Sequence, residues 1–318
     1  MRRRGGISVG YIPAGPRTSG SSRLQVYLPS DRLAESPAKS VFVLRRPEKF
    51  SRKLRVREVS RILLEVLWRR ISTVVFQKVH KGAAPALMRL LRLFGRRIIY
   101  VEADARSDVA FVKYVDAIVA PSRALAEDLG RRSGVPTYHI PDPVEHWDRS
   151  ALDRPWLPKD RYRCVWVGGH KNWHQIERLK TDLRTARYNA FDIVTISDHR
   201  NADLPWKLDT VRKNLGGADL GIIPTSDDQA ALMKSHNRAT LFMALGIPLL
   251  VRASPVYANL VLDGETAFVF HNAEDLKAIT KRLETSSLVE AIRSQAMRAA
   301  EDYHLDRVAG LWAALFRM

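Results

Sequence analysis

Two cationic side chains, a hydroxyl and an amide occur together in the five residues from Lys234 to Arg238. The apolar stretch that follows, 239–245, predicts a helix, so these groups lie at or near a helix N-terminus. That end of a helix offers free N–H groups and partial positive charge, which favour phosphate oxygens. Helix capping would account for Ser235 and Asn237 but not for both cations. The segment therefore predicts a diphosphate site.

A second pattern suited to phosphate follows the apolar run 164–167. Gly168 and Gly169 come directly after that run, and Lys171 precedes a predicted helix. Glycines allow close approach to the backbone, and a helix N-terminus and a lysine both favour phosphate oxygens. We therefore expect these three residues to contact the same class of ligand.

Metal, ATP and dinucleotide sites are not predicted. His170 and His174 are four residues apart, but the glutamate of H-E-x-x-H and a third ligand are missing. Gly15 to Ser22 have P-loop spacing, but Ser21 stands where that motif needs lysine, and no G-x-G-x-x-G occurs. We expect no metal and no cofactor. The remaining Gly/Ser-rich loop either meets a polar acceptor or is an ordinary strand-to-helix turn. Its candidate acceptor residues are Ser19, Gly20, Ser21 and Arg23.

Short runs rich in Val and Ile alternate with helical patterns, which is typical of βα units and parallel sheets. The predicted strands of the first half are 7–12, 41–44, 73–76, 97–101, 117–120 and 137–140, with helices at 84–94 and 122–132, the latter capped by Ser122. Those of the second half are 163–167, 191–196, 219–223, 248–251 and 267–270, with helices from about Trp173, Lys207, Asn237 and Asn272 and a helical end at 288–316. Prolines between the two series disfavour regular structure. We predict an α/β protein with Rossmann-like domains at 1–145 and 163–300, a linker at 146–162 and a final helical segment at 301–318.

The composition fits a folded protein of a reducing compartment. The chain has 318 residues, 46% of them hydrophobic, which suffices for two domains with separate cores. The single Cys164 cannot form an intrachain disulfide. The basic start at Met1 leads to an apolar run that Gly and Pro13 interrupt, so it does not resemble a signal peptide. No apolar run approaches the roughly 20 residues of a membrane span. We therefore expect a cytoplasmic protein.

The formal charge of +18 is concentrated in one stretch, because Arg45 to Arg97 contain 16 Lys or Arg and 3 Glu. Within it, apolar residues from Leu54 to Ile71 recur at three- and four-residue steps and leave arginines on the other face. This predicts a basic amphipathic helix near 52–70. Its charged face either is merely solvated or docks on an anionic membrane surface. Nucleic acid is not expected, since few aromatic residues are interleaved with the arginines.

Ordered sequence blocks place the chain near a known family. The blocks are 116–126 (DAIVAPSRALA), 134–136 (GVP), 140–144 (IPDPV), 218–224 (ADLGIIP), 243–248 (MALGIP) and 261–268 (VLDGETAF). Together they resemble GT-B glycosyltransferases of the family-4 kind. The resemblance implies two Rossmann-like domains facing a cleft, with the C-terminal helix crossing back to the first domain. It also implies a nucleotide sugar in the second domain, an acceptor mainly in the first, and no metal.

Glycosyl transfer builds negative charge on the departing diphosphate, which Lys171, Lys234 and Arg238 are suited to stabilise. An inverting enzyme also needs a general base from the first domain. Asp104 follows a predicted strand and is our candidate, with Glu102 and His80 as weaker ones. A helix N-cap explains Asp104 equally well.

One departure from the family is clear. Such enzymes typically carry two glutamates separated by seven residues, and the alignment puts Met233 and Leu241 there. The sugar and ribose must then be held differently, with Ser235, Asn237 and Tyr257 as candidates. We expect a metal-independent hexosyltransferase that acts on a glycan or lipid-linked saccharide of bacterial surface polysaccharide synthesis, at the inner face of the cell membrane. The alternatives are a catalytically degenerate binding or scaffold protein and a sugar-nucleotide epimerase.

Overall fold

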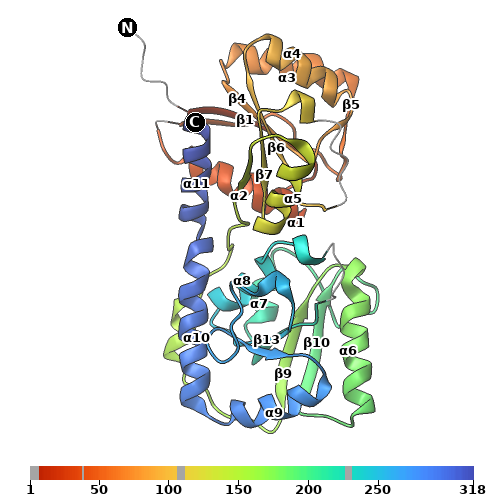
Figure 1. Cartoon of the computed structure of the whole chain (residues 1–318), viewed down its shortest axis with the longest axis vertical. Coiled ribbons are helices and arrows are strands. Elements are labelled where there is room, and N and C mark those ends of the chain that lie inside the picture. The colour runs from red at the N-terminus through yellow and green to blue at the C-terminus, as the bar shows by residue number, and fades with distance from the viewer. Residues whose placement is uncertain (1–6, 38, 106–111, 226–230) are drawn as a thin grey trace. The chain divides into compact units, whose positions relative to one another are not determined.

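The computed structural model describes residues 7–37, 39–105, 112–225 and 231–318. The chain forms two compact units (Figure 1). The first contains Met1–Glu145, Met233–Ser235 and Tyr303–Met318, and the second contains His146–Leu232 and His236–Asp302. Each unit has its own parallel sheet and its own core.

The first unit is built on a six-stranded parallel sheet of order β2-β1-β4-β6-β7-β8. Its strands are β1 Ile7–Pro13, β2 Lys39–Val43, β4 Thr73–Gln77, β6 Arg97–Val101, β7 Ala117–Ala120 and β8 Thr137–His139. The chain adds β2 on one side of β1 and adds β6, β7 and β8 on the far side of β4, so the direction in which strands are added reverses between β1 and β4. Open α/β sheets bind ligands beyond the carboxyl ends of the strands at such a switch point.

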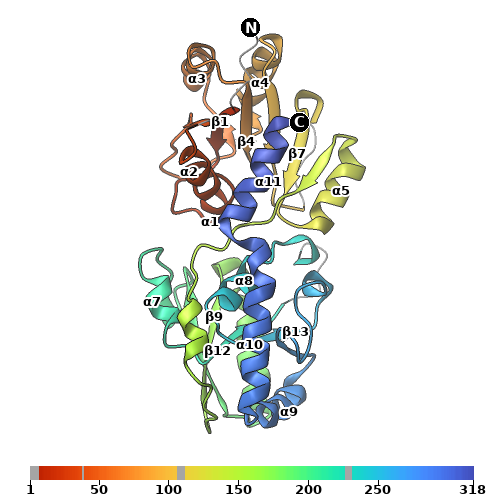
Figure 2. The same cartoon turned by 90° about the vertical axis from the view of Figure 1, so that its left-hand side faces the viewer.

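Helices cover both faces of this sheet (Figure 2). Because side chains alternate along a strand, Val74 and Phe76 enter one core while Val75 enters the other. The first core is completed by α3, α4 and α5, and the second by η1, α2 and α11. The helical elements are α1 Gly20–Ser22, the π-helix η1 Arg23–Tyr27, α2 Leu28–Ala34, α3 Val56–Trp68, α4 Ala84–Leu93, η2 Val112–Tyr114, α5 Arg123–Ser133 and α11 Leu305–Arg317, and a small sheet pairs β3 Lys53–Leu54 with β5 Lys81–Gly82.

Helix α3 is the basic amphipathic helix predicted from the sequence, although it is shorter than the apolar pattern. Ile62 and Val66 are fully buried against the sheet. Val56, by contrast, is 81% exposed, and Leu54 belongs to β3 rather than to the helix. The predicted cap of α5 is confirmed, since the Ser122 hydroxyl accepts a hydrogen bond from the N–H of Leu125 at 3.2 Å.

The second unit repeats the plan with a parallel sheet of order β11-β10-β9-β12-β13-β14. Its switch point lies between β9 and β12. The strands are β9 Tyr162–Val167, β10 Phe191–Ser197, β11 Leu204–Pro205, β12 Leu220–Ile223, β13 Leu249–Arg252 and β14 Phe268–Phe270. The helical elements are η3 Arg149–Asp153, η4 His170–Asn172, α6 Trp173–Thr185, α7 Val211–Leu215, η5 Ala231–Met233, α8 Asn237–Ala244, η6 Pro255–Tyr257, α9 Ala273–Leu283, α10 Ser286–Ala300 and η7 Glu301–Tyr303.

Residues 146–162, which we predicted as a linker, lie in the second unit. Trp156 stacks on Tyr162 at the start of β9, with ring centroids 5.6 Å apart. Arg293 of α10 donates hydrogen bonds to the carbonyls of Ala151 and Arg154. This proline-rich stretch contains little regular secondary structure beyond the short η3, and packing against the second unit holds it in place.

The prediction of an α/β chain with two Rossmann-like halves is confirmed. The helical end of the chain also has the predicted course, because α10 belongs to the second unit and α11 packs in the core of the first. Among the helices of the described residues, none combines the length and apolar character needed to cross a bilayer.

Candidate functional site

Helix α8 of the second unit begins without a side-chain cap. Its N-cap residue is His236, and neither Ser235 nor Asn237 caps it. The helix follows β12, so it begins at the carboxyl edge of the sheet, next to the switch point between β9 and β12. The first N–H groups of α8 are therefore not taken by a cap, which suits them to an anion.

Arg238 lies in the first turn of α8. Its Nη1 atom is buried and has no hydrogen-bond partner among the residues that the structure describes. A buried guanidinium N–H group without an acceptor is unfavourable, so native proteins seldom contain one. The position and this unmet donor together favour an anionic ligand at the start of α8.

His236 is held in place by its own contacts. Its Nε2 atom lies 2.8 Å from the Val256 carbonyl oxygen and must carry a hydrogen to donate to it. Burial lowers the pKa of His236, and the hydrogen bond opposes this effect only in part, so the ring is neutral at pH 7. Tyr257 packs beside it, with ring centroids 5.7 Å apart, and is itself only 2% exposed. Tyr257, a predicted donor-binding residue, thus contributes its ring mainly to packing around His236.

The predicted diphosphate segment is divided between the units. Lys234 and Ser235 belong with the first unit, whereas Asn237 and Arg238 belong with the second. Ser235 hydrogen-bonds to the buried carboxylate of Asp142. The five residues thus do not form one cluster within either unit.

The glycine loop after β9 has two parts with different roles. A Cβ atom on Gly168 would lie 2.2 Å from Cζ2 of the fully buried Trp166, so the Trp ring itself requires glycine there. A Cβ on Gly169 would meet only Asp198, at 3.8 Å. Lys171 follows in η4 and is exposed. Gly169 and Lys171 are therefore open to a ligand at the carboxyl edge, while Gly168 is explained by packing.

A histidine–aspartate pair at the same edge was not predicted. Asp198, directly after β10, accepts hydrogen bonds from the backbone N–H of His170 at 2.6 Å and contacts its Nδ1 at 2.8 Å. Burial would raise the pKa of Asp198, but the hydrogen bonds from His170 outweigh it and lower the pKa. Next to it, His199 stacks on Trp173 with ring centroids 4.2 Å apart. The signal in the sequence was the position of Asp198 and His199 just after a predicted strand.

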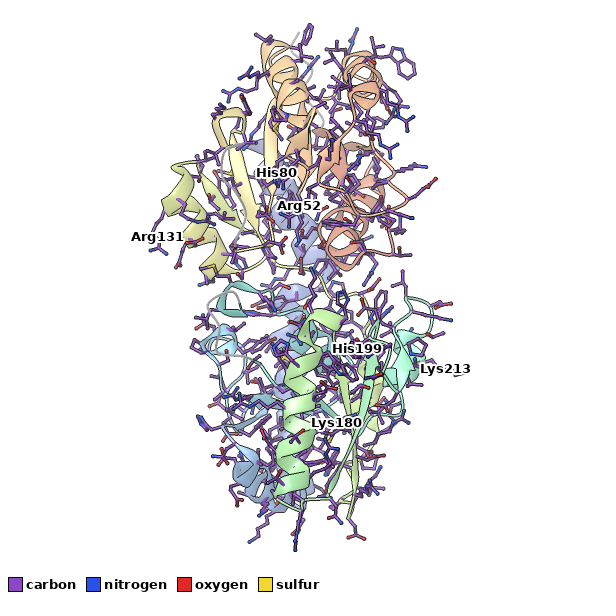
Figure 3. The ribbon with its side chains drawn as sticks, turned by 90° about the vertical axis from the view of Figure 1, so that its right-hand side faces the viewer. Arg52, His80, Arg131, Lys180, His199 and Lys213 are labelled. Atoms are coloured by element: carbon purple, nitrogen blue, oxygen red, sulfur yellow. The ribbon has the colours of Figure 1, made fainter. Side chains whose placement is uncertain are left out.

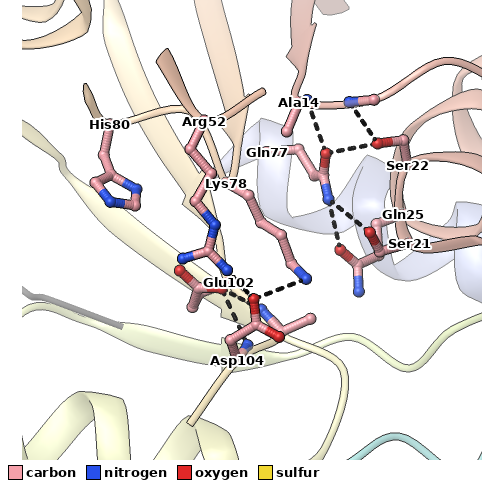
Figure 4. Close-up of polar contacts among 12 residues, drawn as sticks. Ala14, Ser21, Ser22, Gln25, Arg52, Gln77, Lys78, His80, Glu102 and Asp104 are labelled. Carbon is pink, nitrogen blue, oxygen red and sulfur yellow. Dashed lines mark hydrogen bonds and ion pairs between the residues drawn. The ribbon is translucent and has the colours of Figure 1, made fainter. Parts of the chain in front are cut away.

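In the first unit, a buried amide organises the Gly/Ser-rich loop at the switch point (Figure 4). Gln77, at the end of β4, is fully buried. Its Oε1 accepts hydrogen bonds from the N–H of Ala14 and the hydroxyl of Ser22, both at 3.0 Å. Its Nε2 donates to Ser21 at 3.4 Å and to Gln25 at 3.3 Å. Gln77, which fixes the loop to the sheet, was not among the residues predicted from the sequence.

The four predicted acceptor residues differ in availability. Ser19 is the N-cap of α1 and makes no side-chain cap, and a Cβ on Gly20 would meet nothing within 4 Å. Ser21 contacts Gln77, whereas Arg23 is buried and forms an ion pair with Glu145 at 2.9 Å. Ser19, Gly20 and Ser21 are therefore placed to meet a ligand, and Arg23 is committed to Glu145.

A cluster of charges lies next to this loop, at the carboxyl ends of β4 and β6 (Figure 4). Lys78 follows β4 in a left-handed backbone conformation, with φ of 57°, and its Nζ lies 3.1 Å from Asp104. Asp104 also pairs with Arg52. Glu102 is fully buried, and its Oε1 accepts the N–H groups of Ala103 at 2.9 Å and of Asp104 at 3.0 Å. Two cations thus hold the predicted base, Asp104.

The two weaker base candidates are connected to each other. His80 Nδ1 lies 2.7 Å from the hydroxyl of Tyr100, which in turn lies 3.5 Å from Glu102. Burial raises the pKa of Glu102, although the charge of Lys78 opposes this. Figure 3 shows His80 and Arg52 close together on the first unit, and the backbone N–H of His80 bonds to the carbonyl of Arg52. The residues that follow Asp104 closely enough to test its predicted role as a helix cap include 106–111, which lie outside the described residues.

Metal ligands are not gathered anywhere in the described part of the chain. No group of three or more His, Cys, Asp or Glu residues suited to a metal ion occurs there. His170, one half of the rejected metal pattern, is engaged with Asp198 instead.

No protein-family model and no curated protein matches this sequence. Solved structures do match its fold over nearly the full length of both chains. HepE from Anabaena in complex with UDP-glucose has a TM-score of 0.68 at 11% identity, covering 97% of this chain and 98% of that one. A glycosyltransferase from Rickettsia africae has a TM-score of 0.74 at 11% identity, covering 99% and 98%. Sucrose-phosphate synthase from Thermosynechococcus elongatus has a TM-score of 0.63 at 12% identity, covering 97% and 98%. The predicted GT-B fold is confirmed.

Proposed function

We propose that the chain is a glycosyltransferase that moves a sugar from a nucleoside diphosphate sugar to a hydroxyl of a glycan or lipid-linked saccharide. The observation that carries the proposal is Arg238, whose buried Nη1 has no hydrogen-bond partner among the described residues, at the uncapped start of α8. The neighbour HepE, which has this fold, was solved with UDP-glucose. A diphosphate would satisfy both the arginine and the helix N–H groups.

The proposed reaction develops negative charge on the diphosphate leaving group. As the bond between the sugar and the diphosphate breaks, negative charge grows on the leaving group, and donors fixed in advance stabilise it. In this proposal Arg238, the first turn of α8 and Lys171 supply that stabilisation without a metal. Asn237, which opens the same helix, contacts the donor.

On the acceptor side, we assign the activation of the hydroxyl to the cluster around Asp104. Asp104 is 44% exposed in its side chain, so it is accessible although Arg52 and Lys78 pair with it. Glu102 is fully buried and therefore acts through its neighbours rather than on the acceptor itself. The hydroxyl and N–H groups of Ser19, Gly20 and Ser21 would bind the acceptor.

Membrane contact belongs to the same proposal, because a lipid-linked acceptor lies at an anionic surface. The exposed face of α3 carries Leu64 and Trp68, which are 67% and 77% exposed, and Leu93 at the end of α4 is 81% exposed. Arg61 and Arg92 accompany them. Large apolar side chains flanked by arginines are suited to the interface of an anionic bilayer. We place the protein at the inner face of the cell membrane.

The test of the donor site is calorimetric titration with UDP of the wild type, of Arg238→Gln, and of Lys180→Gln. Lys180 lies on α6, where Figure 3 labels it, and provides the same change of charge away from α8. We expect Arg238→Gln to weaken UDP binding about tenfold and Lys180→Gln to leave it unchanged. Equal binding by all three proteins would remove the assignment of Arg238.

A second candidate function is a non-catalytic binding or scaffold protein. It is favoured by Met233 and Leu241, which stand where related enzymes carry glutamates. A turnover screen with UDP-, GDP- and ADP-sugars separates the two. Donor consumption that needs an added glycan supports the transferase, consumption without acceptor supports an epimerase or hydrolase, and neither binding nor turnover supports the scaffold.

A further inference from the structure

A cavity of about 300 Å³ lies in the second unit, away from the edge that carries the proposed donor site. Its walls include Lys159, Asp219 and Pro248, which come just before β9, β12 and β13. In a parallel sheet these are the amino ends of the strands. The cavity is therefore at the opposite edge from Gly169 and the start of α8.

Positive charge dominates the lining of this cavity. Two acidic residues, Asp148 and Asp219, face four cationic ones. The cationic residues are Arg154, Lys159, Arg212 and Arg293, and the apolar part of the wall includes Trp156, Leu157 and Ile247. A pocket with an apolar wall and convergent cations is suited to a small organic anion.

Arg293 is the most buried of these cations, at 7% exposure. Its Nε donates to the carbonyl of Gly246 at 2.9 Å, its Nη1 to that of Arg154 at 2.8 Å, and its Nη2 to that of Ala151. In the described part of the chain, no carboxylate lies within 4.0 Å of this guanidinium. Its acceptors are thus neutral, and a buried cation normally has an anionic partner. Burial and the nearby Arg154 lower the pKa of Arg293, and the charge of Glu290 opposes this only in part.

A purely structural role explains only part of this arrangement. As a clamp, Arg293 joins α10 to residues 151–154 and to the turn before β13. That role does not explain why three further cations line the same space. Arg154 and Lys159 pair with Asp148 and Asp219. Arg212 makes no ion pair within 4.0 Å among the described residues, although its charge helps to lower the pKa of Asp148. The four cations that line the cavity thus outnumber its two carboxylates.

We propose that this cavity is a second binding site, which takes a small metabolite through an oxyanion group, either phosphate or carboxylate. Arg212 on α7 closes on the anion from the open side, and Arg293 supplies positive charge from the buried side. The apolar wall around Trp156 and Ile247 accommodates the carbon skeleton. The site does not depend on the proposed glycosyl transfer.

Isothermal titration with inorganic phosphate, and separately with malonate, at fixed ionic strength tests this site. All proteins carry Arg238→Gln, which weakens the proposed diphosphate site as a competing site for phosphate. Arg212→Gln is compared with Lys213→Gln, because Lys213 is the next residue of α7, is exposed and does not line the cavity (Figure 3). The two variants change the net charge equally.

We expect saturable binding of at least one probe at one site per chain. Arg212→Gln should weaken it about tenfold, and Lys213→Gln should change it by less than about twofold. Stronger binding of phosphate or of malonate identifies the oxyanion that the site prefers. Failure of both probes to saturate, or equal losses in the two variants, would overturn the proposal. Binding that persists in the Arg238→Gln background also separates this site from the proposed donor site.

Discussion

The ammonium group of Lys78 lies 3.1 Å from the carboxylate of Asp104, although Lys78 must adopt a left-handed backbone conformation to place it there. Such a conformation is costly for a residue with a side chain, and it persists at functional sites where surrounding contacts enforce it. The same ammonium also opposes the effect of burial on Glu102. Lys78 thus neutralises two carboxylates at the switch point of the first sheet.

Replacing Lys78 with methionine should lower the free energy of unfolding by about 1 to 2 kcal/mol. Asp104 keeps its contact with solvent and its ion pair with Arg52, but Glu102 loses the cation that most opposes the effect of burial on its pKa. The replacement should also reduce sugar transfer by more than the loss of folded protein accounts for. Urea unfolding and a transfer assay measure the two effects. Lys53→Met, at an exposed position in β3, is the control. A Lys78→Met protein with full activity would show that the cluster has only a structural role.

Glu102 should make the stability of the protein depend on pH. Burial raises the pKa of Glu102 in the folded state above its ordinary value of 4.5. The stability that the protonated carboxyl contributes is therefore fully present below pH 4.5, and it is lost as the pH rises through the pKa of the folded state. Glu102→Gln should therefore be more stable than the wild type at pH 7 and less sensitive to pH above about 4.5, where the wild type loses up to about 1.4 kcal/mol per pH unit. Urea unfolding between pH 4.5 and pH 7 measures this. Parallel curves for the wild type, Glu102→Gln and the exposed control Glu127→Gln would contradict it.

The two glycines after β9 should respond differently to alanine. Gly168→Ala places a methyl group in the ring of Trp166 and should destabilise the protein by about 1 to 3 kcal/mol. Gly169→Ala has space for its methyl group and should change stability by less than about 0.5 kcal/mol, yet weaken UDP binding if the backbone approaches the phosphates there. Thermal unfolding and UDP titration separate the two effects. Equal losses of stability would mean that both glycines are required by packing.

The exposed apolar residues of α3 and α4 should determine binding to lipid. Flotation with vesicles that contain anionic lipid should recover the wild type, and Trp68→Ser should reduce the recovered fraction several-fold. Leu262→Ser, at a 44% exposed position in the second unit, should float like the wild type. Recovery that is insensitive to lipid charge, or equal for the two variants, would argue against membrane docking through this face.

Elements with strong periodicity were predictable from the sequence, and contacts between distant residues were not. The α3 stripe around Ile62 and the Ser122 cap depend on neighbours a few residues away, so local rules suffice. Gln77 and Ser22 are 55 residues apart and meet only because β1 and β4 are adjacent in the sheet. The pairing of His170 with Asp198 likewise depends on β9 and β10 lying side by side.

The Lys234–Arg238 segment shows a different limit. Its chemistry and its helix start were evident from residue types, and α8 begins at Asn237 as expected. The division of these residues between two units was not evident from the sequence. It depends on the hydrogen bond between Ser235 and the buried Asp142, which lies 93 positions earlier. No short-range pattern carries that information.

The last helix, α11, affects when the first unit can fold during synthesis. Trp312 of α11 packs against Tyr11 of β1 at 6.3 Å between ring centroids, and α11 fills one of the two cores of the first unit. While the ribosome is still translating residues 146–302, that face of the first sheet is covered only by η1 and α2. The amino-terminal half therefore cannot finish folding as it emerges, contrary to the usual order for domains. Until α11 is made, the part of this apolar face that Trp312 and Leu315 cover stays open to solvent.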